Sequence, residues 1–366
     1  MRDKRFGATN PSNMSVPAPI RWALARTGEG LPNPTDPPAL IVMDPPEHTR
    51  LRRPVTSAFT PHAMADLTDR IIEVSGQLLD ELEPHSHAEL IGDFAARLPV
   101  AIIAHILGVP PRDSHKILEW GNSGAPLFDI GVNRNGYRRG IEGLGEAREY
   151  FGRLVDRLRS EPDSSIFGQV VTTSDLTRHE LTATASIIMG AGFETTMNML
   201  GSGIVLLLRH PEQLAMLRAD PELWPNAVEE ILRIESPAQM TMRRAHEDIE
   251  LAGHRMQAGE IVMLLLGGAN RDPARFDNPD SFDITRERAR EHVAFGQGIH
   301  TCLGARLARI EGAIGLRMLF ERFPDLALDG EPELRGLAVL RGFDRIPVQL
   351  SPIRTCPMSI SPTRSR

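Results

Sequence analysis

The sequence predicts a mainly α-helical domain with a minor β-sheet region, and three features support this fold class. Residues 177–210 form one stretch without internal proline, which predicts a helix about 48 Å long at about 1.5 Å per residue. A second helix is expected over 225–235, because a proline suits its first position and a Ser-Pro pair ends it. The convincing β-rich runs, 249–251 and 261–266, are separated by glycines that are typical of turns.

The start and the centre of the long helix are both marked in the sequence. Thr177 suits an N-cap, and Glu180 three residues later completes a capping box. Gly190, Ala191 and Gly192 lie at the centre, where a glycine costs about 1 kcal/mol relative to alanine. Small residues at this point indicate that something bulky packs closely against the helix.

The composition limits the classes of function. The chain has 366 residues, of which 41% are hydrophobic and 24% charged, and its formal net charge is −7. This balance argues against a nucleic-acid partner, because phosphate neutralisation needs a basic surface. Two cysteines cannot build a disulfide framework, which favours a reducing compartment. With no signal peptide and no apolar run of membrane-spanning length in the sequence, a cytoplasmic protein is expected.

Composition also divides the chain into three parts. Residues 1–43 are rich in proline and glycine and are expected to be irregular. Residues 44–352 are expected to form one domain, because no linker or internal repeat interrupts them. Residues 353–366 have the composition of a disordered tail.

The segment richest in chemistry is 295–306, Phe-Gly-Gln-Gly-Ile-His-Thr-Cys-Leu-Gly-Ala-Arg. It presents Cys302 in a glycine-rich loop directly before a helix, where unpaired N–H groups and the helix dipole favour a thiolate. Glycines let the backbone turn and approach a flat cofactor closely. The alternative is a buried structural cysteine beside a turn.

The Phe-x-x-Gly-x-x-x-Cys-x-Gly spacing of this segment resembles the haem-binding loop of cytochromes P450. The resemblance implies that Cys302 ligates the iron of haem b (iron protoporphyrin IX). A thiolate ligand pushes electron density that favours O–O cleavage. Phe295, Gly296 and Gly304 are then expected to border the cofactor.

A second motif lies in the middle of the long helix, at Ala191-Gly192-Phe193-Glu194-Thr195-Thr196. It resembles the oxygen-activation motif of the P450 family, in which a carboxylate and a threonine distort the helix locally and relay protons. The resemblance implies that Glu194 and Thr195 deliver protons. It also implies that Ala191 and Gly192 border the oxygen site. Alternatively, Thr195 only donates a hydrogen bond back to a helix carbonyl.

A third motif, Glu230-Ile231-Leu232-Arg233, places a carboxylate and a guanidinium three residues apart on one helix face. It resembles the Glu-x-x-Arg pair of the family, which implies a structural ion pair joined by Arg286. Such a pair would hold the loop that leads to Phe295. The alternative is a solvated pair that contributes little stability.

Four basic residues are candidates for the haem propionates. The segment Asp44 to Arg52 resembles the family's His-x-x-x-Arg motif after a Pro-Pro turn, and it supplies His48 and Arg52. Family position adds Arg243 and His300. Arginine suits carboxylates because its donors form a bidentate fork. Arg53 and Arg244 are the neighbouring alternatives, and any single candidate could be an ordinary surface cation.

The match runs from about Asp44 to about Leu350, and the N-terminus departs from the family pattern. Family members have a first helix and two strands of the main sheet upstream of this point, and here those elements are expected to be missing. Either the assigned start is wrong or the gene is shortened. The runs 249–251 and 261–266 are therefore expected to lack partners, which leaves an exposed edge and lowers stability.

The resemblance implies a haem-thiolate monooxygenase that inserts one atom of dioxygen into a hydrophobic small molecule. Electrons would come from a separate ferredoxin-type donor and its reductase, so NAD(P)H would act only indirectly. Arg306 and Arg309 could receive an acidic donor, or could simply keep a helix soluble. Family position places the substrate pocket at 22–41, 121–136, 188–193 and 238–241. The alternatives are a catalytically silent haem-binding sensor and a P450 that uses peroxide.

Overall fold

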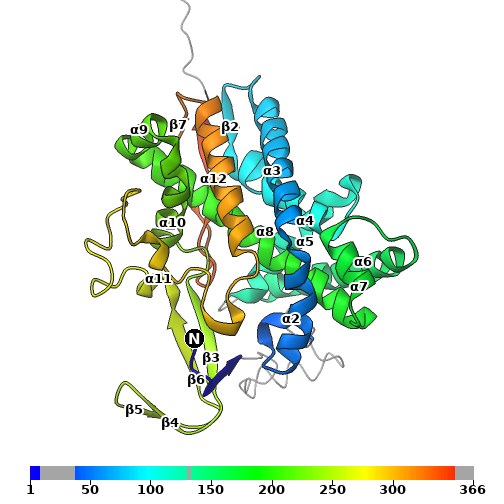
Figure 1. Ribbon diagram of the computed structural model, residues 1–366. Coiled ribbons are helices and arrows are strands. Elements are labelled where there is room, and N and C mark those ends of the chain that lie inside the picture. The colour runs from blue at the N-terminus through cyan, green and yellow to red at the C-terminus, as the bar shows by residue number, and fades with distance from the viewer. Residues whose placement is uncertain (9–37, 130–132, 351–366) are drawn as a thin grey trace, which may run out of the picture.

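The computed structural model describes residues 1–8, 38–129 and 133–350, which are mainly helical (Figure 1). The long helix α8 (Arg178–Arg209) runs through the centre, as predicted. Its neighbours surround it on several sides, and they are α4 (Arg97–Leu107), α5 (Ser114–Gly124), α6 (Arg134–Ser160), α10 (Trp224–Ile234) and α12 (Ala305–Arg322).

The capping box predicted for α8 is confirmed. The Thr177 hydroxyl accepts the Glu180 N–H at 3.3 Å, and the Glu180 carboxylate accepts the Thr177 N–H at 2.8 Å. Among the described helices, α8 alone is long and apolar enough to cross a membrane, but 72% of its most apolar window is buried inside the protein. A buried apolar helix with neighbours on several sides is the core of this domain.

The remaining helices cover this core. Figure 1 shows α12 and α3 side by side in front of α8. The other α-helices of the described residues are α2 (Glu47–Ala58), α3 (Pro61–Leu82), α7 (Ile166–Thr173), α9 (Pro211–Ala219) and α11 (Leu266–Ala269), and they are joined by a π-helical turn (Ile91–Ala95) and by short 3-10 turns.

A small antiparallel sheet has β3 (Met240–Ala245) at its centre, between β1 (Phe6–Ala8) and β6 (Ile261–Leu265). A separate hairpin joins β4 (Ile249–Leu251) to β5 (His254–Met256), and it projects from the lower edge of the molecule in Figure 1.

One expectation about the strands is wrong. In the N-terminal part, β1 joins the sheet of the domain that follows, and residues 9–37 lie outside the described residues. Neither β-rich run lacks a partner, since β4 pairs with β5 and β6 pairs with β3. Strand β3 escaped prediction because its sequence, Met-Thr-Met-Arg-Arg-Ala, has little of the β-branched and aromatic character typical of strands.

A second sheet and a hairpin lie near the end of the described chain. The strand order is β2 (His87–Glu89), β10 (Pro347–Gln349) and β7 (Ala327–Leu328), while β8 (Glu333–Leu334) pairs with β9 (Phe343–Arg345). Strand β9 packs beside α8 and so brings Arg335 to that helix. The predicted tail 353–366 and most of the predicted pocket segment 22–41 lie outside the described residues.

Candidate active site

The loop before α12 turns sharply and presents Cys302 at the start of that helix. The Cys302 N–H donates to the Phe295 carbonyl at 2.9 Å. Gly296 and Gly298 have φ angles of 67° and 83°, in the left-handed region that favours glycine. A Cβ on Gly298 would also lie 2.6 Å from the carbonyl oxygen of Met1. The predicted role of these glycines in turning the loop is confirmed.

The thiol of Cys302 is reached by solvent although protein atoms surround it closely. This burial raises the pKa of the Cys302 thiol, while the Gly304 N–H and the charges of Arg52 and Arg309 oppose the effect. The Gly304 N–H at the helix terminus therefore favours the thiolate as predicted, but in the polypeptide by itself burial outweighs this effect. A metal cation bonded to the sulfur would deprotonate it outright.

Four basic side chains from α2, β3 and the cysteine loop converge beside Cys302. The rings of His48 and His300 lie 4.4 Å apart, and Arg52 donates to the carbonyl of Thr301 at 2.5 Å. The pKa of His300 falls to about 4, first through burial and then through the charges of His48 and Arg243. The structure therefore brings together the four residues predicted from separate motifs.

This cluster fits a bound group with two carboxylates. The Nε2 atoms of His48 and His300 are buried without a hydrogen-bond partner among the described residues. Burial lowers the pKa values of His48, Arg52 and Arg243, so each positive charge is disfavoured where it stands. Anions such as the two propionates of haem would satisfy the histidine donors and offset the charge repulsion.

The geometry also separates the propionate candidates from their neighbours. Arg53 is exposed, whereas Arg52 reaches the cysteine loop. Arg243 acts electrostatically on His300, and Arg244 is not among the groups that perturb His300. The arrangement therefore favours Arg52 and Arg243.

On α8, the residues of the predicted proton relay face different partners. The Thr195 hydroxyl donates to the Ala191 carbonyl at 2.8 Å, which is the alternative geometry considered for this residue. Glu194 is 2% exposed and forms an ion pair with Arg335, and its Oε1 lies 3.5 Å from the Asn198 amide nitrogen. No hydrogen bond joins the described side chains of Glu194 and Thr195, and the helix is regular through both.

The small residues at the centre of α8 have two different surroundings. Ala191 is exposed, and its predicted place at the border of the oxygen site stays a prediction. A Cβ on Gly192 would lie 2.5 Å from the Ile103 side chain of α4. Close packing of α4 therefore accounts for the small residue at position 192, and the place of Gly192 at the oxygen site stays a prediction.

Arg335 was missed by the sequence analysis because it lies in a short hairpin 141 residues from its partner. Its Nε also donates to Asp344 at 2.8 Å. Burial raises the pKa of Glu194, and the charge of Arg335 opposes that rise. Arg335 thus partly compensates a carboxylate held in an apolar setting.

Glu194 also lines a pocket between α5, α6 and α8. Two segments predicted for the substrate pocket, 121–136 and 188–193, contribute to its lining, whereas the predicted segment 238–241 does not. The lining is mainly apolar, and its large side chains are Trp120, Leu127, Leu144, Ile187, Met189 and Leu340.

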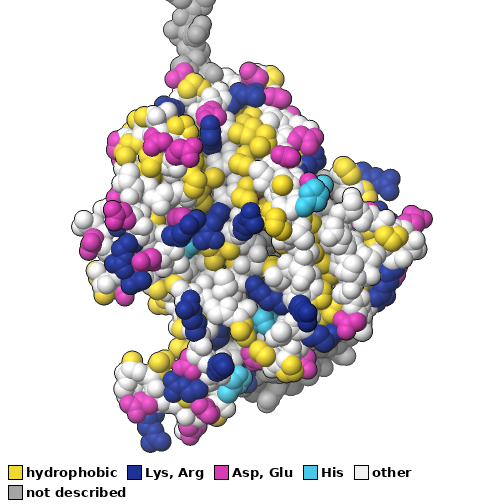
Figure 2. Space-filling model, viewed as in Figure 1, with side chains coloured by type: hydrophobic (Ala, Val, Ile, Leu, Met, Phe, Trp, Pro, Cys, Tyr) yellow, Lys and Arg dark blue, Asp and Glu magenta, His cyan; other side chains and the backbone are white. Residues whose placement is uncertain are grey.

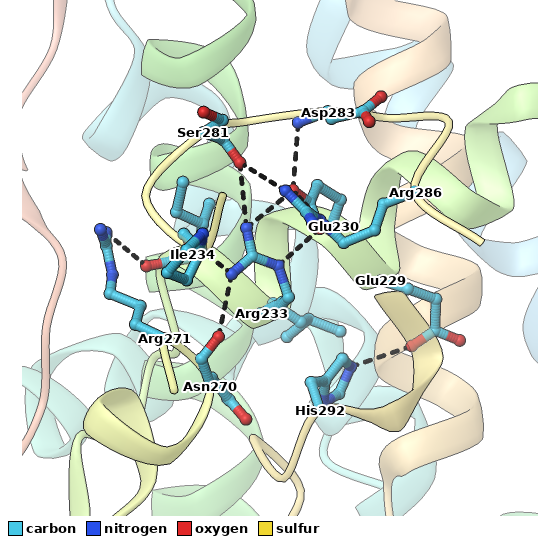
Figure 3. Close-up of polar contacts among 12 residues, drawn as sticks. Glu229, Glu230, Arg233, Ile234, Asn270, Arg271, Ser281, Asp283, Arg286 and His292 are labelled. Carbon is cyan, nitrogen blue, oxygen red and sulfur yellow. Dashed lines mark hydrogen bonds and ion pairs between the residues drawn. The ribbon is translucent and has the colours of Figure 1, made fainter. Parts of the chain in front are cut away.

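The predicted ion pairs of α10 are present and deeply buried (Figure 3). Arg233 donates through Nε and Nη2 to Glu230 at 2.7 and 2.8 Å, and both side chains are fully buried. Arg286 donates to the same carboxylate at 3.1 Å. Arg233 also donates to the carbonyls of Asn270, Pro279 and Ser281, which ties the loop that leads to Phe295 to the helix.

The preceding residue, Glu229, forms a second network that the sequence analysis missed. Its carboxylate accepts hydrogen bonds from Arg290, His292 and Arg309. Arg309, a candidate for donor docking, therefore already has an internal partner. The sequence did offer a signal for this network. It is a second glutamate directly before Glu230, on a helix with a strongly apolar face.

Cations gather on the face that carries the cysteine loop. Figure 2 shows Lys and Arg side chains around the middle of the face on which α12 and α2 lie. Arg306 is exposed on α12, directly after this loop. An acidic protein surface would therefore meet complementary charge here, despite the negative net charge of the chain.

Comparison with known proteins assigns the family. The cytochrome P450 family model matches residues 161–334. A Mycobacterium tuberculosis relative named cytochrome P450 140 is 42% identical, over 93% of this chain and 80% of the relative. The biotin biosynthesis cytochrome P450 of Bacillus subtilis is 40% identical, over 84% and 79%.

Solved structures agree with that assignment. The crystal structure of P450BioI with a hexadec-9Z-enoic acid ligated acyl carrier protein has a TM-score of 0.86 and 36% identity, over 96% of this chain and 89% of that chain. CYP109E1 from Bacillus megaterium in complex with testosterone has a TM-score of 0.79 and 33% identity, over 86% and 87%. The chain therefore belongs to the cytochrome P450 family of haem-dependent monooxygenases.

Proposed function

We propose that this enzyme inserts one oxygen atom from dioxygen into a hydrophobic small molecule, with electrons from a separate ferredoxin-type donor. The observation that carries the proposal is the convergence of Cys302 with His48, Arg52, Arg243 and His300. A solvent-accessible sulfur lies next to a cluster of buried donors that needs anions. Haem b, which carries one metal and two carboxylates, would satisfy both parts of this arrangement.

In this proposal Cys302 is the iron ligand, and His48, Arg52, Arg243 and His300 hold the propionates. Bound haem supplies the redox chemistry that activates dioxygen. The chain contributes a fixed sulfur position, because the Cys302 N–H is held by the Phe295 carbonyl. Phe295, Gly296 and Gly304 would lie against the macrocycle, and glycine leaves room for its approach.

Proton delivery is assigned to the open face of α8. Thr195 is partly buried beside the exposed Ala191, so its hydroxyl could exchange the helix carbonyl for a bound molecule. Glu194 would supply protons from the side of α8 that faces Arg335. The ion pair between Glu194 and Arg335 would have to open before this step. Burial raises the pKa of Glu194, which favours the protonated form that a proton donor needs.

A hydrophobic substrate is supported by the pocket beside Glu194. Its lining is apolar apart from Glu194, Ser186 and the indole N–H of Trp120, which already donates to Glu146, so apolar contacts would dominate recognition. An acidic ferredoxin is supported by the exposed Arg306 and by the cationic face in Figure 2. NADPH would act through the ferredoxin reductase and not on this chain.

The test is reconstitution of the purified enzyme with a ferredoxin, its reductase, NADPH and labelled dioxygen. The expected product of an apolar substrate library carries one labelled oxygen atom per molecule. Haem binding without substrate-dependent NADPH use would instead support a silent sensor. Turnover with hydrogen peroxide at a rate that exceeds the reconstituted system would support a peroxide-using enzyme.

A further inference from the structure

Glu229 of α10 is a buried carboxylate with an unusual number of donors. It is 2% exposed, and its Oε1 accepts both Arg290 Nε at 2.9 Å and Arg309 Nε at 2.8 Å. Its Oε2 accepts His292 Nε2 at 3.0 Å and Arg309 Nη2 at 3.1 Å. Burial alone would raise the pKa of Glu229, but these hydrogen bonds bring it down to about 2.

The contact with His292 is directional (Figure 3). His292 Nδ1 accepts the Ala294 N–H at 3.1 Å, so the ring proton must lie on Nε2, where it is donated to Glu229. This tautomer holds the chain just before Phe295. The carboxylate therefore restrains the cysteine loop from its N-terminal side.

The contact with Arg309 reaches the same loop from α12, the helix that follows the loop. The Arg309 guanidinium carbon lies 4.5 Å from the centre of the Phe295 ring, within cation–π range. Phe295 accepts the Cys302 N–H through its carbonyl oxygen. A continuous path of contacts therefore leads from Glu229 through Arg309 and Phe295 to Cys302.

Arg290 provides an internal comparison. It donates to the same Oε1 atom as Arg309, but its side chain is 75% exposed. The cation–π contact of Phe295 is made by Arg309 and not by Arg290. The two arginines thus share a carboxylate and differ in their connection to the cysteine loop.

We infer that Glu229 is a positioning residue for the iron ligand, because it holds Arg309 over Phe295 and thereby fixes the backbone of Cys302. Neither Glu229 nor Arg309 touches the reacting atoms in this account. The inference rests on the proposed ligation of iron by Cys302.

The test compares four variants of the haem-loaded protein, Glu229→Gln, Arg309→Gln, Arg290→Gln and the double variant Glu229→Gln/Arg309→Gln. The readout is the share of the reduced, carbon-monoxide-bound protein that shows the red-shifted Soret band of thiolate ligation, at equal haem content. Glu229→Gln and Arg309→Gln should each lose part of that band. Arg290→Gln should match the wild type, and the double variant should lose no more than the larger single loss.

Three results would overturn the inference while leaving Cys302 ligation intact. They are a wild-type spectrum for Glu229→Gln, an equal loss for Arg290→Gln and Arg309→Gln, or additive losses in the double variant. If Glu229→Gln does not fold, the comparison between Arg309→Gln and Arg290→Gln decides alone. Absence of the red-shifted band from the wild type would instead refute the proposed function.

Discussion

Replacing Arg233 by methionine should destabilise the fold, because backbone carbonyl groups that now accept hydrogen bonds from the guanidinium would lose their donor. Methionine fills similar space without donors, so the carbonyls of Asn270 and Pro279 lose the donor that Arg233 provides. The Ser281 carbonyl keeps a hydrogen bond from Arg286. Glu230 also keeps Arg286, so it does not become a lone buried charge.

A buried carbonyl left without a donor costs about 1–3 kcal/mol; the Asn270 carbonyl is buried and that of Pro279 is half-buried, so the expected loss is about 1–6 kcal/mol. This range includes the figure of about 3–5 kcal/mol for removing one partner of a buried ion pair. The assay is equilibrium urea unfolding of Arg233→Met, followed by far-ultraviolet circular dichroism. The matched control is Arg317→Gln, which breaks the exposed pair with Glu321 and should cost about 0.5 kcal/mol or less. A loss below about 1 kcal/mol for Arg233→Met would refute the reasoning.

Three further predictions concern buried carboxylates and the cysteine loop. The pKa of Glu229 is depressed to about 2, so the ionised carboxylate stabilises the folded state above the ordinary carboxyl pKa. This stabilisation is lost as the pH falls towards 2. The urea midpoints of the wild type and Glu229→Gln should therefore converge between about pH 5 and pH 3. Burial raises the pKa of Glu311 to about 8, so this group destabilises the fold increasingly as pH rises above its unfolded value. Glu311→Gln should thus raise the urea midpoint at pH 8 and change it little at pH 5. Gly298→Ala should lower the thermal midpoint more than Gly296→Ala, because both have positive φ but only a Cβ at 298 would clash with Met1, at 2.6 Å.

The sequence predicted the features that depend on local spacing. The capping box at Thr177 and the ion pair of Glu230 with Arg233 follow from intervals of three residues within a helix, and both are present. The convergence of His48 and His300 needed the family resemblance, because these residues lie in separate motifs. Local chemistry alone could not place them 4.4 Å apart.

The features that escaped prediction depend on tertiary packing. Gly192 is small because Ile103 of α4 packs against it, and nothing in the sequence near Gly192 indicates that neighbour. Arg335 reaches Glu194 from a hairpin, and burial of the Cys302 thiol outweighs the effect of the helix terminus. Long-range contacts and desolvation of this kind become visible only once the chain is folded.

The most direct measurement is the absorbance spectrum of the reduced, carbon-monoxide-bound protein, recorded for the wild type, Cys302→Ser and Cys356→Ser. We expect a strongly red-shifted Soret band in the wild type and in Cys356→Ser, and its loss in Cys302→Ser. An unchanged band in Cys302→Ser would contradict the assignment of Cys302 as the iron ligand.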